Sequence, residues 1–281
     1  MLFEVRDLRV AFADQTRKKL LRPAPTVEVL HGIDLSVPAG STIGIVGESG
    51  SGKSTLARAM LRLLEPSGGS IHFDGIDITR MAERDLRPLR RRMQIVFQDS
   101  QSALNPRQTV GRILAEPFVT NGLVRSVRAA RERVMELLAL VGLSPAFFDR
   151  YAHQLSGGQR QRVGIGRALA LDPAVIVADE IVSGLDVSVQ AQILQLLENL
   201  RQARGLTLLL ISHDLSVVRA TCETVVVMCR GEVVEAGPTA DVFSQPASPY
   251  TRNLLRAIPL PVVDPEWIYR VTLDEAPAAA G

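Results

Sequence analysis

The sequence predicts an α/β fold in which a largely parallel β-sheet is flanked by helices, because short apolar runs alternate with helical patterns along the chain. Thr42–Val46, Ala174–Ala178 and Leu206–Ile211 are runs of the length and apolar character expected of buried strands. A glycine-rich stretch follows the first run, and acidic residues follow the second. Both therefore lie where a strand ends, the position at which parallel sheets bind ligands.

The N-terminal part is predicted to form a β-hairpin. Residues 1–10 alternate apolar and polar side chains and include acidic ones, which indicates a strand and not a signal peptide. The basic, proline-containing stretch Ala13–Glu28 interrupts the hairpin. We expect it to be a solvated loop, with contact to a partner or to lipid headgroups as the alternative.

The remaining core elements follow in order. Lys53–Leu64 is predicted to be a helix that leaves the glycine-rich stretch, and Gly68-Gly69 turns the chain into a strand at Ser70–Phe73. Further short strands are predicted at Gln94–Phe97 and Val225–Met228. No internal repeat is visible, so we expect a single copy of this core.

Residues 98–165 break the alternation and are predicted to form a helical insertion. Ser126 is a plausible N-cap, Gly142 a C-terminal stop, and between them lies one apolar stripe of Val127, Ala130, Val134, Leu137, Leu138 and Val141. A second amphipathic helix is predicted from Val189, Ile193, Leu196, Leu197 and Leu200, ending near Gly205.

Composition excludes several classes of protein. The chain has 281 residues with 32 basic and 30 acidic side chains, a formal net charge of +2, which gives no electrostatic basis for nucleic-acid binding. No apolar stretch approaches the roughly 20 residues needed to span a bilayer. The two cysteines, Cys222 and Cys229, form no C-x-x-C pair, so a zinc site or disulfide framework is not expected. We expect a soluble cytosolic protein.

The stretch after the first buried strand matches the phosphate-loop pattern G-x-x-x-x-G-K-[ST] at every fixed position. Its glycines let backbone N–H groups approach phosphates, Lys53 would reach the β and γ oxygens, and the Ser54 hydroxyl would bind Mg²⁺. Thr55 would add a phosphate contact. The alternative is a glycine-rich turn that merely precedes a helix. The predicted ATP contacts are Gly47, Glu48, Ser49, Gly50, Ser51, Gly52, Lys53, Ser54 and Thr55.

Two adjacent carboxylates, Asp179 and Glu180, follow the buried run Ala174–Ala178. Asp179 would hold Mg²⁺ through water, and Glu180 would polarise the attacking water. The structural alternative is an acid that caps a helix at a strand exit.

Leu155–Arg162, LSGGQRQR, predicts a second anion-binding helix N-terminus without a phosphate loop of its own. Two glycines after Ser156 leave several N–H groups unshielded, and the nucleotide they face would be held by another subunit. The alternative is a serine N-cap with flexible glycines.

LSGGQ beside a phosphate loop resembles the ABC ATPases along nearly the whole chain. The resemblance implies a phosphate-loop NTPase (RecA-like) parallel-sheet core with an N-terminal antiparallel β subdomain and an inserted α-helical subdomain. It also implies roles for four further sites: Gln98 at Mg²⁺ and the attacking water, His213 at the γ-phosphate, the D-loop Ser183–Asp186 at the partner subunit, and Phe12 stacked on adenine or, alternatively, simply in the core.

The implied catalytic set is Glu180, His213, Gln98 and Lys53, with Ser54, Gln98 and Asp179 at the metal. Ser156, Gly157, Gly158, Gln159 and Asp186 would contact nucleotide across a dimer. One departure is visible: Ile181 stands where most of the family has proline, which would loosen the turn into the D-loop.

Four segments resemble the oligopeptide, dipeptide and nickel importer ATPases: Phe97–Arg107, Arg150–Gly158, Leu185–Gln192 and Ser248–Pro259. The implied organisation is a nucleotide-binding domain over residues 1–245, with the helical subdomain at about 98–165, and a C-terminal extension over residues 246–281. Some members of this group bind an iron–sulfur cluster through cysteines. No cysteine follows Cys229, so we predict no cluster.

The resemblance implies an ATPase that uses ATP and Mg²⁺ to power solute import at the cytoplasmic face of the cell membrane. It would pair head-to-tail with an identical or homologous ATPase subunit under two membrane permeases fed by a solute-binding protein. Peptide import is the first interpretation and nickel or metal-chelate import the second. A ribosome- or DNA-acting ABC ATPase is disfavoured by the single nucleotide unit and near-neutral charge, and a phosphate-loop kinase or GTPase leaves LSGGQRQR unexplained.

Overall fold

The computed structural model describes residues 1–13, 26–97 and 104–256. The chain divides into two compact units. The first comprises Met1–Met93 and Thr207–Pro259, and the second comprises Gln94–Leu206 with Leu260–Gly281.

The first unit contains an antiparallel sheet with strand order β2-β1-β4-β5. Its strands are β1 (Phe3–Ala13), β2 (Thr26–Val37), β4 (Gly68–Phe73) and β5 (Ile76–Asp77). The buried side chains of β1 change from odd to even positions, from Phe3 and Val5 to Leu8 and Val10, because a register shift lies between Val5 and Leu8. Asp7, inside the bulge, has a φ of 46°. The predicted N-terminal hairpin is confirmed, and most of the basic stretch lies outside the described residues.

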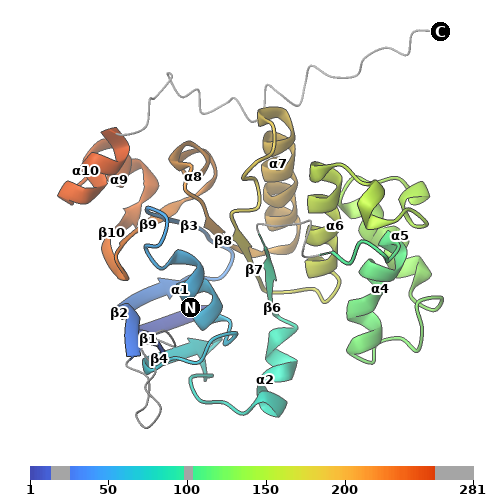
Figure 1. The fold of residues 1–281 in the computed structure, drawn as a ribbon, viewed down its shortest axis with the longest axis horizontal. Coiled ribbons are helices and arrows are strands. Elements are labelled where there is room, and N and C mark those ends of the chain that lie inside the picture. The colour runs from blue at the N-terminus through green and yellow to red at the C-terminus, as the bar shows by residue number, and fades with distance from the viewer. Residues whose placement is uncertain (14–25, 98–103, 257–281) are drawn as a thin grey trace, which may run out of the picture. The chain divides into compact units, whose positions relative to one another are not determined.

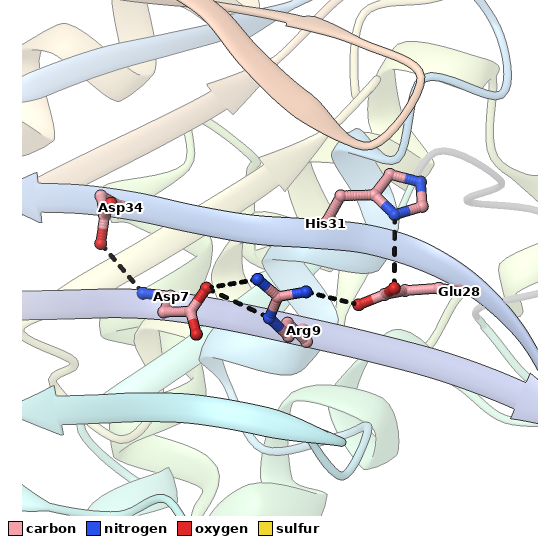
Figure 2. A network of polar contacts seen from close by, with 5 residues as sticks. All are labelled: Asp7, Arg9, Glu28, His31 and Asp34. Carbon is pink, nitrogen blue, oxygen red and sulfur yellow. Dashed lines mark hydrogen bonds and ion pairs between the residues drawn. The ribbon is translucent and has the colours of Figure 1, made fainter.

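A polar network joins β1 to β2 on the exposed side of this sheet (Figure 2). Arg9 contacts Asp7 at 2.9 Å and Glu28 at 3.4 Å, and Glu28 lies 3.6 Å from His31. The Asp7 N–H donates to Asp34 Oδ1 at 2.9 Å and so holds the bulge. Exposed ion pairs of this kind contribute little individually, so the network sets the register of the bulge more than the stability of the sheet.

The strands of the second sheet that belong to the first unit have the order β10-β9-β3-β8. Its members are β3 (Thr42–Val46), β8 (Thr207–Ile211), β9 (Thr224–Cys229) and β10 (Glu232–Pro238). β3 is parallel to both β8 and β9, whereas β10 runs antiparallel to β9. β3 and β8 are buried along their whole length, which explains their continuous apolar sequence.

Five helices belong to the described part of the first unit: α1 (Lys53–Met60), α2 (Glu83–Arg90), α8 (Leu215–Thr221), α9 (Thr239–Ser244) and α10 (Pro249–Arg256). α8 packs directly on β3 at Gly44, where an added Cβ would lie 2.3 Å from Val218 Cγ1.

The described part of the second unit consists mainly of helices. α4 (Val110–Thr120), α5 (Arg131–Leu140) and α6 (Gly157–Leu169) lie side by side, with α7 (Val187–Arg204) against α6 (Figure 1). Short 3₁₀ turns at Pro145–Phe147 and Ala152–Gln154 connect α5 to α6. β6 (Met93–Val96) and β7 (Val175–Asp179) are neighbouring strands.

Two predicted helix boundaries are wrong. α1 ends at Met60 instead of Leu64, because Arg62 turns to a φ of 53° and its guanidinium donates to Ile78 O at 2.9 Å. α5 begins at Arg131 with Ala130 as N-cap. Ser126 instead caps the preceding turn, accepting the Ala129 N–H at 3.2 Å. The end of the second predicted helix is confirmed, since Gly205 closes α7 in the left-handed conformation.

Candidate functional site

The phosphate loop connects β3 to α1 in the first unit, as predicted. Lys53 is 5% exposed and its Nζ donates to Gly47 O and Glu48 O, both at 2.8 Å. The phosphate loop therefore encloses the Lys53 ammonium group. Glu48, Ser49 and Gly50 form the exposed rim, so their backbone is accessible to a phosphate.

Backbone geometry explains two of the glycines at this loop. Gly47 has a φ of 149°, and a Cβ there would lie 2.1 Å from Met228 O. Gly231, in the β9–β10 turn, has a φ of 82°, and its N–H donates to Ser51 O at 2.9 Å. The Gly231 carbonyl in turn accepts the His31 N–H at 3.0 Å. The β9–β10 turn thus ties the phosphate loop to β2.

His213 lies two residues after the end of β8 and is exposed. Its position is fixed from both sides: the preceding Ser212 N–H donates to Ile45 O at 3.2 Å, and the following Asp214 accepts the Ser216 N–H at 2.9 Å as the N-cap of α8. A histidine between a strand end and a capped helix is presented to solvent at the edge of the sheet where β3 leads into the phosphate loop.

Phe12 lies on β1 opposite Val27, and both side chains are exposed, at 43% and 53%. The alternative interpretation of Phe12 as a core residue is therefore wrong. An exposed ring supplies the flat apolar surface that stacking on a base requires, and that role stays a prediction.

In the second unit, β7 ends at Asp179, which is 4% exposed, and Glu180 follows with a φ of 50°. Ser183 N–H donates to Glu180 O at 3.1 Å, which closes a turn into the D-loop. Ile181 is 1% exposed within that turn.

The signature segment, Leu155–Arg162, opens α6 as predicted. Ser156 is the N-cap: its Oγ accepts the Gln159 N–H at 3.3 Å, and Gln159 Oε1 accepts the Ser156 N–H at 3.0 Å. This reciprocal arrangement is a capping box. The structural alternative for Ser156 is thus confirmed, and its contact to the nucleotide of a partner subunit stays a prediction.

The two signature glycines pack against the D-loop and α7. A Cβ at Gly157 would lie 3.2 Å from Leu185 Cδ2, and one at Gly158 only 2.4 Å from Val189 Cγ1. Asp186 is the N-cap of α7 and accepts the Val189 N–H at 2.9 Å. The hydrogen bonds from Val189 and Ser188 lower the pKa of the Asp186 carboxyl. The structure therefore brings the signature segment and D-loop together within the second unit.

Gln98 lies outside the described residues, so its predicted place at the metal is not described. Among the described residues there is no cluster of three His, Cys, Asp or Glu side chains that would hold a metal ion by itself. Cys222 is buried and Cys229 half-buried, and both are free thiols. Ser54 in the first unit offers a hydroxyl, and Asp179 in the second unit offers a buried carboxylate; both are oxygen donors of the kind that Mg²⁺ prefers.

Tyr250 on α10 was not among the predicted site residues, yet it contacts the phosphate loop. The Glu48 N–H donates to Tyr250 Oη at 3.2 Å. The two residues are separated by 202 positions in the sequence, so spacing could not reveal the contact. In the sequence, the tail segment that contains Tyr250 indicates only a subfamily resemblance.

A phosphate loop between a parallel strand and a helix defines the chain as a phosphate-loop nucleotide-binding protein. Residues 30–183 match the family described as ABC transporter, and residues 234–280 match the oligopeptide/dipeptide transporter C-terminal region. The chain belongs to the ABC transporter family. The predicted fold class and family resemblance are both confirmed.

Among its relatives is the oligopeptide transport ATP-binding protein AppF of Bacillus subtilis, 47% identical over 92% of this chain and 78% of AppF. OppF of Escherichia coli is 43% identical over 95% of this chain and 80% of OppF. A putative peptide import ATP-binding protein of Brucella ovis is 46% identical over 91% of this chain and 80% of that protein. The chain is therefore an ABC-type ATPase coupled to transmembrane transport.

Solved structures agree with this family assignment. The ATP-binding cassette MJ0796, a dimer bound to ADP and Pi, superposes with a TM-score of 0.71 at 30% identity, over 84% of this chain and 98% of that one. CbiO1 of Clostridium perfringens, part of the transporter complex cbiONQ, gives a TM-score of 0.73 at 29% identity over 87% of this chain and 91% of its own. Among the described residues, none of the helices has both the length and the apolar character needed to cross a bilayer.

Proposed function

We propose that this chain is the ATP-hydrolysing subunit of an importer of di- or oligopeptides. The observation that supports the solute class is the match of residues 234–280 to the oligopeptide/dipeptide transporter C-terminal region, together with relatives at 43% to 47% identity named for peptide transport. These relatives align over most of this chain and of their own length, so the similarity is not confined to the nucleotide-binding part.

ATP binding is proposed to depend on the phosphate loop. Loop N–H groups from Ser49 to Thr55 and the Lys53 ammonium would bind the phosphates, with Glu48 beside them at the exposed rim of the loop, and Phe12 would stack on adenine. Ser54, Asp179 and Gln98 would hold Mg²⁺, whose bound charge offsets that of the phosphates.

Hydrolysis is proposed to depend on a general base and a γ-phosphate contact. Glu180 would polarise the attacking water and His213 would contact the γ-phosphate, while Gln98 would orient the water. Lys53 would stabilise charge on the leaving phosphates.

The signature segment is proposed to act on the nucleotide of a partner. Two ATPase subunits would pair head-to-tail, so that Ser156, Gly157, Gly158 and Gln159 of one subunit face the phosphates bound by the other, with Asp186 at the same contact. MJ0796, which this chain resembles, is dimeric. The pair would lie at the cytoplasmic face of the membrane under two permease subunits, and closure of the pair would move them.

Glu180→Gln tests the assigned chemistry. The variant should bind ATP as tightly as the wild type and lose turnover by at least about 100-fold, since a general base contributes about 10²–10⁴. Binding is measured by displacement of a fluorescent ATP analogue, and turnover by phosphate release. Glu65→Gln, an exposed glutamate of the first unit, is the matched control and should behave as wild type. Turnover by Glu180→Gln at the wild-type rate would contradict the role.

The solute is tested in cells. Uptake of radiolabelled di- and tripeptides should require this chain and fail when Glu180→Gln replaces it. Uptake of ⁶³Ni²⁺, alone or chelated, should be unchanged by the same replacement. The reverse pattern would show that the second interpretation, nickel or metal-chelate import, is correct.

A further inference from the structure

The C-terminal helix α10 reaches the phosphate loop through one side chain. Tyr250, on the first turn of α10, accepts the Glu48 N–H at 3.2 Å. The Glu48 side chain is exposed while Tyr250 is half-buried. The contact is therefore made by the loop backbone and does not depend on the side chain at position 48.

The peptide group between Gly47 and Glu48 is held at both ends. Its N–H end donates to Tyr250, and its carbonyl end, Gly47 O, accepts Lys53 Nζ at 2.8 Å. In a trans peptide the C=O and N–H point in opposite directions. Tyr250 thus contacts this peptide from the side away from Lys53 and does not compete with the lysine or with the phosphates that the lysine would reach.

These two hydrogen bonds hold the peptide group that lies where β3 ends and the phosphate loop begins. Gly47 has a φ of 149°, a conformation that favours glycine and leaves the following peptide without the restraint of a strand. A donor and an acceptor bonded to one peptide group polarise it in the same sense, so each bond strengthens the other. Removing the tyrosine hydroxyl should therefore weaken the hold of Gly47 O on Lys53 and let the peptide rotate.

α10 is itself anchored to the sheet. Glu235 on β10 accepts the Ala247 N–H at 2.7 Å and the Ser248 N–H at 3.1 Å, at the start of this helix. Burial alone would raise the pKa of Glu235, but the nearby Thr251 hydroxyl and the Ala247 and Ser248 N–H groups lower it overall. The carboxylate thus stays ionised at neutral pH and fixes the turn that presents Tyr250.

We propose that Tyr250 is a positioning residue for the phosphate loop: by fixing the Gly47–Glu48 peptide group it strengthens binding of nucleoside di- and triphosphates. The proposal rests on the assigned role of Lys53 in phosphate binding. It adds a residue of the C-terminal extension to the nucleotide site. Burial raises the pKa of the Tyr250 hydroxyl, so the residue remains a neutral hydrogen-bonding partner over the working pH range.

The test uses the full 281-residue chain and Tyr250→Phe, which keeps the ring and removes only the hydroxyl. Displacement of trinitrophenyl-ATP should show that both ATP and ADP bind about fivefold more weakly, the effect of one net hydrogen bond of about 1 kcal/mol. Phosphate release should show KM raised by the same factor and kcat within about twofold of wild type. Hydrogen exchange at the Glu48 amide should become faster.

Two further variants separate positioning from a general effect on folding. Asn253→Ala, an exposed position on α10, should bind ATP as wild type. Glu235→Ala should also weaken ATP binding. In the double variant Glu235→Ala/Tyr250→Phe, the loss of ATP affinity should be smaller than the sum of the two single losses and close to the larger one, because both substitutions act through one contact.

Wild-type ATP affinity and Glu48 exchange in Tyr250→Phe would overturn the proposal, as would a fall in kcat at unchanged KM. Lys53→Ala distinguishes this from failure of the proposed function. If Lys53→Ala loses ATP binding while Tyr250→Phe does not, only the role of Tyr250 is wrong. If Lys53→Ala binds ATP normally, the role assigned to the phosphate loop is wrong.

Discussion

Ser156 is predicted to serve two separable roles, as the N-cap of α6 and as a contact to the nucleotide of a partner subunit. Two substitutions distinguish them. Ser156→Ala removes the hydroxyl and with it the cap. Ser156→Asp retains a capping oxygen, since aspartate caps as well as serine, but places a negative charge where the γ-phosphate would approach.

The expected magnitudes follow from the geometry. Ser156 accepts one N–H, at 3.3 Å, and Gln159 returns a bond to the Ser156 N–H. Losing such a cap costs about 1 kcal/mol, which corresponds to a melting temperature lower by about 2 °C in a chain of this size. Ser156→Asp should be at least as stable as wild type, because an acid at a helix N-terminus adds about 0.3–1 kcal/mol. Hydrolysis should fall about 10-fold in Ser156→Ala and at least about 100-fold in Ser156→Asp.

Three measurements on the same proteins complete the test: thermal unfolding, ATP affinity of the chain alone, and phosphate release in the presence of its ATPase partner. ATP affinity of the chain alone should not change in either variant. Ser126→Asp is the matched control, because Ser126 also accepts an N–H three residues on, from Ala129 at 3.2 Å. Wild-type hydrolysis by Ser156→Asp would refute the proposed contact, and a loss of ATP affinity would show that the serine acts within its own subunit.

Two predictions concern other positions. Gly231→Ala should lower the free energy of urea unfolding by more than about 3 kcal/mol, because its Cβ would lie 2.2 Å from the Val29 carbonyl oxygen at a φ of 82°; Gly75→Ala, at a φ of 78° with no atom within 4 Å of its Cβ, should lose only about 1 kcal/mol, and equal losses would mean that the contact is irrelevant. The bond from Val189 lowers the pKa of the Asp186 carboxyl from 3.8. The ionised carboxylate therefore stabilises the folded chain above pH 3.8, and this stabilisation is lost as the pH falls through the lower folded-state pKa. In acid-unfolding curves, Asp186→Asn should lose less stability than the wild type between about pH 5 and about pH 3, and identical curves would contradict this.

The sequence was sufficient for the elements whose pattern is local. Buried strands such as β3 and β8 have continuous apolar sequences, and Gly205 ends α7 where predicted. The phosphate loop and the signature segment were found because their chemistry requires fixed residue types at fixed spacing. Both lie at the strand–helix and loop–helix junctions that the spacing implies.

Features set by tertiary contacts were beyond the sequence. The end of α1 depends on Arg62 reaching Ile78 O across 16 positions, and the start of α5 falls at Arg131 although Ser126 is the better capping residue. The contact between Tyr250 and Glu48 is the extreme case, because nothing in either local segment requires the other. Such long-range contacts determine how the phosphate loop is held in place, whereas its sequence motif determines only which ligand the loop can bind.

Two of the residues that the family pattern marks as functional, Ser156 and Asp186, are also helix caps. Ser156 begins α6 and Asp186 begins α7, and Asp214, next to His213, begins α8. Each helix N-terminus directs N–H groups and positive dipole toward the end of a loop, which is the environment an anionic phosphate requires. A cap and a phosphate contact therefore need the same oxygen-bearing residue in the same place, and selection for one satisfies the other. It follows that loss of hydrolysis after substitution at Ser156 or Asp186 identifies a catalytic role only when the melting temperature of the variant is unchanged. For that reason replacements that preserve the cap, such as Ser156→Asp and Asp186→Asn, are more informative than alanine.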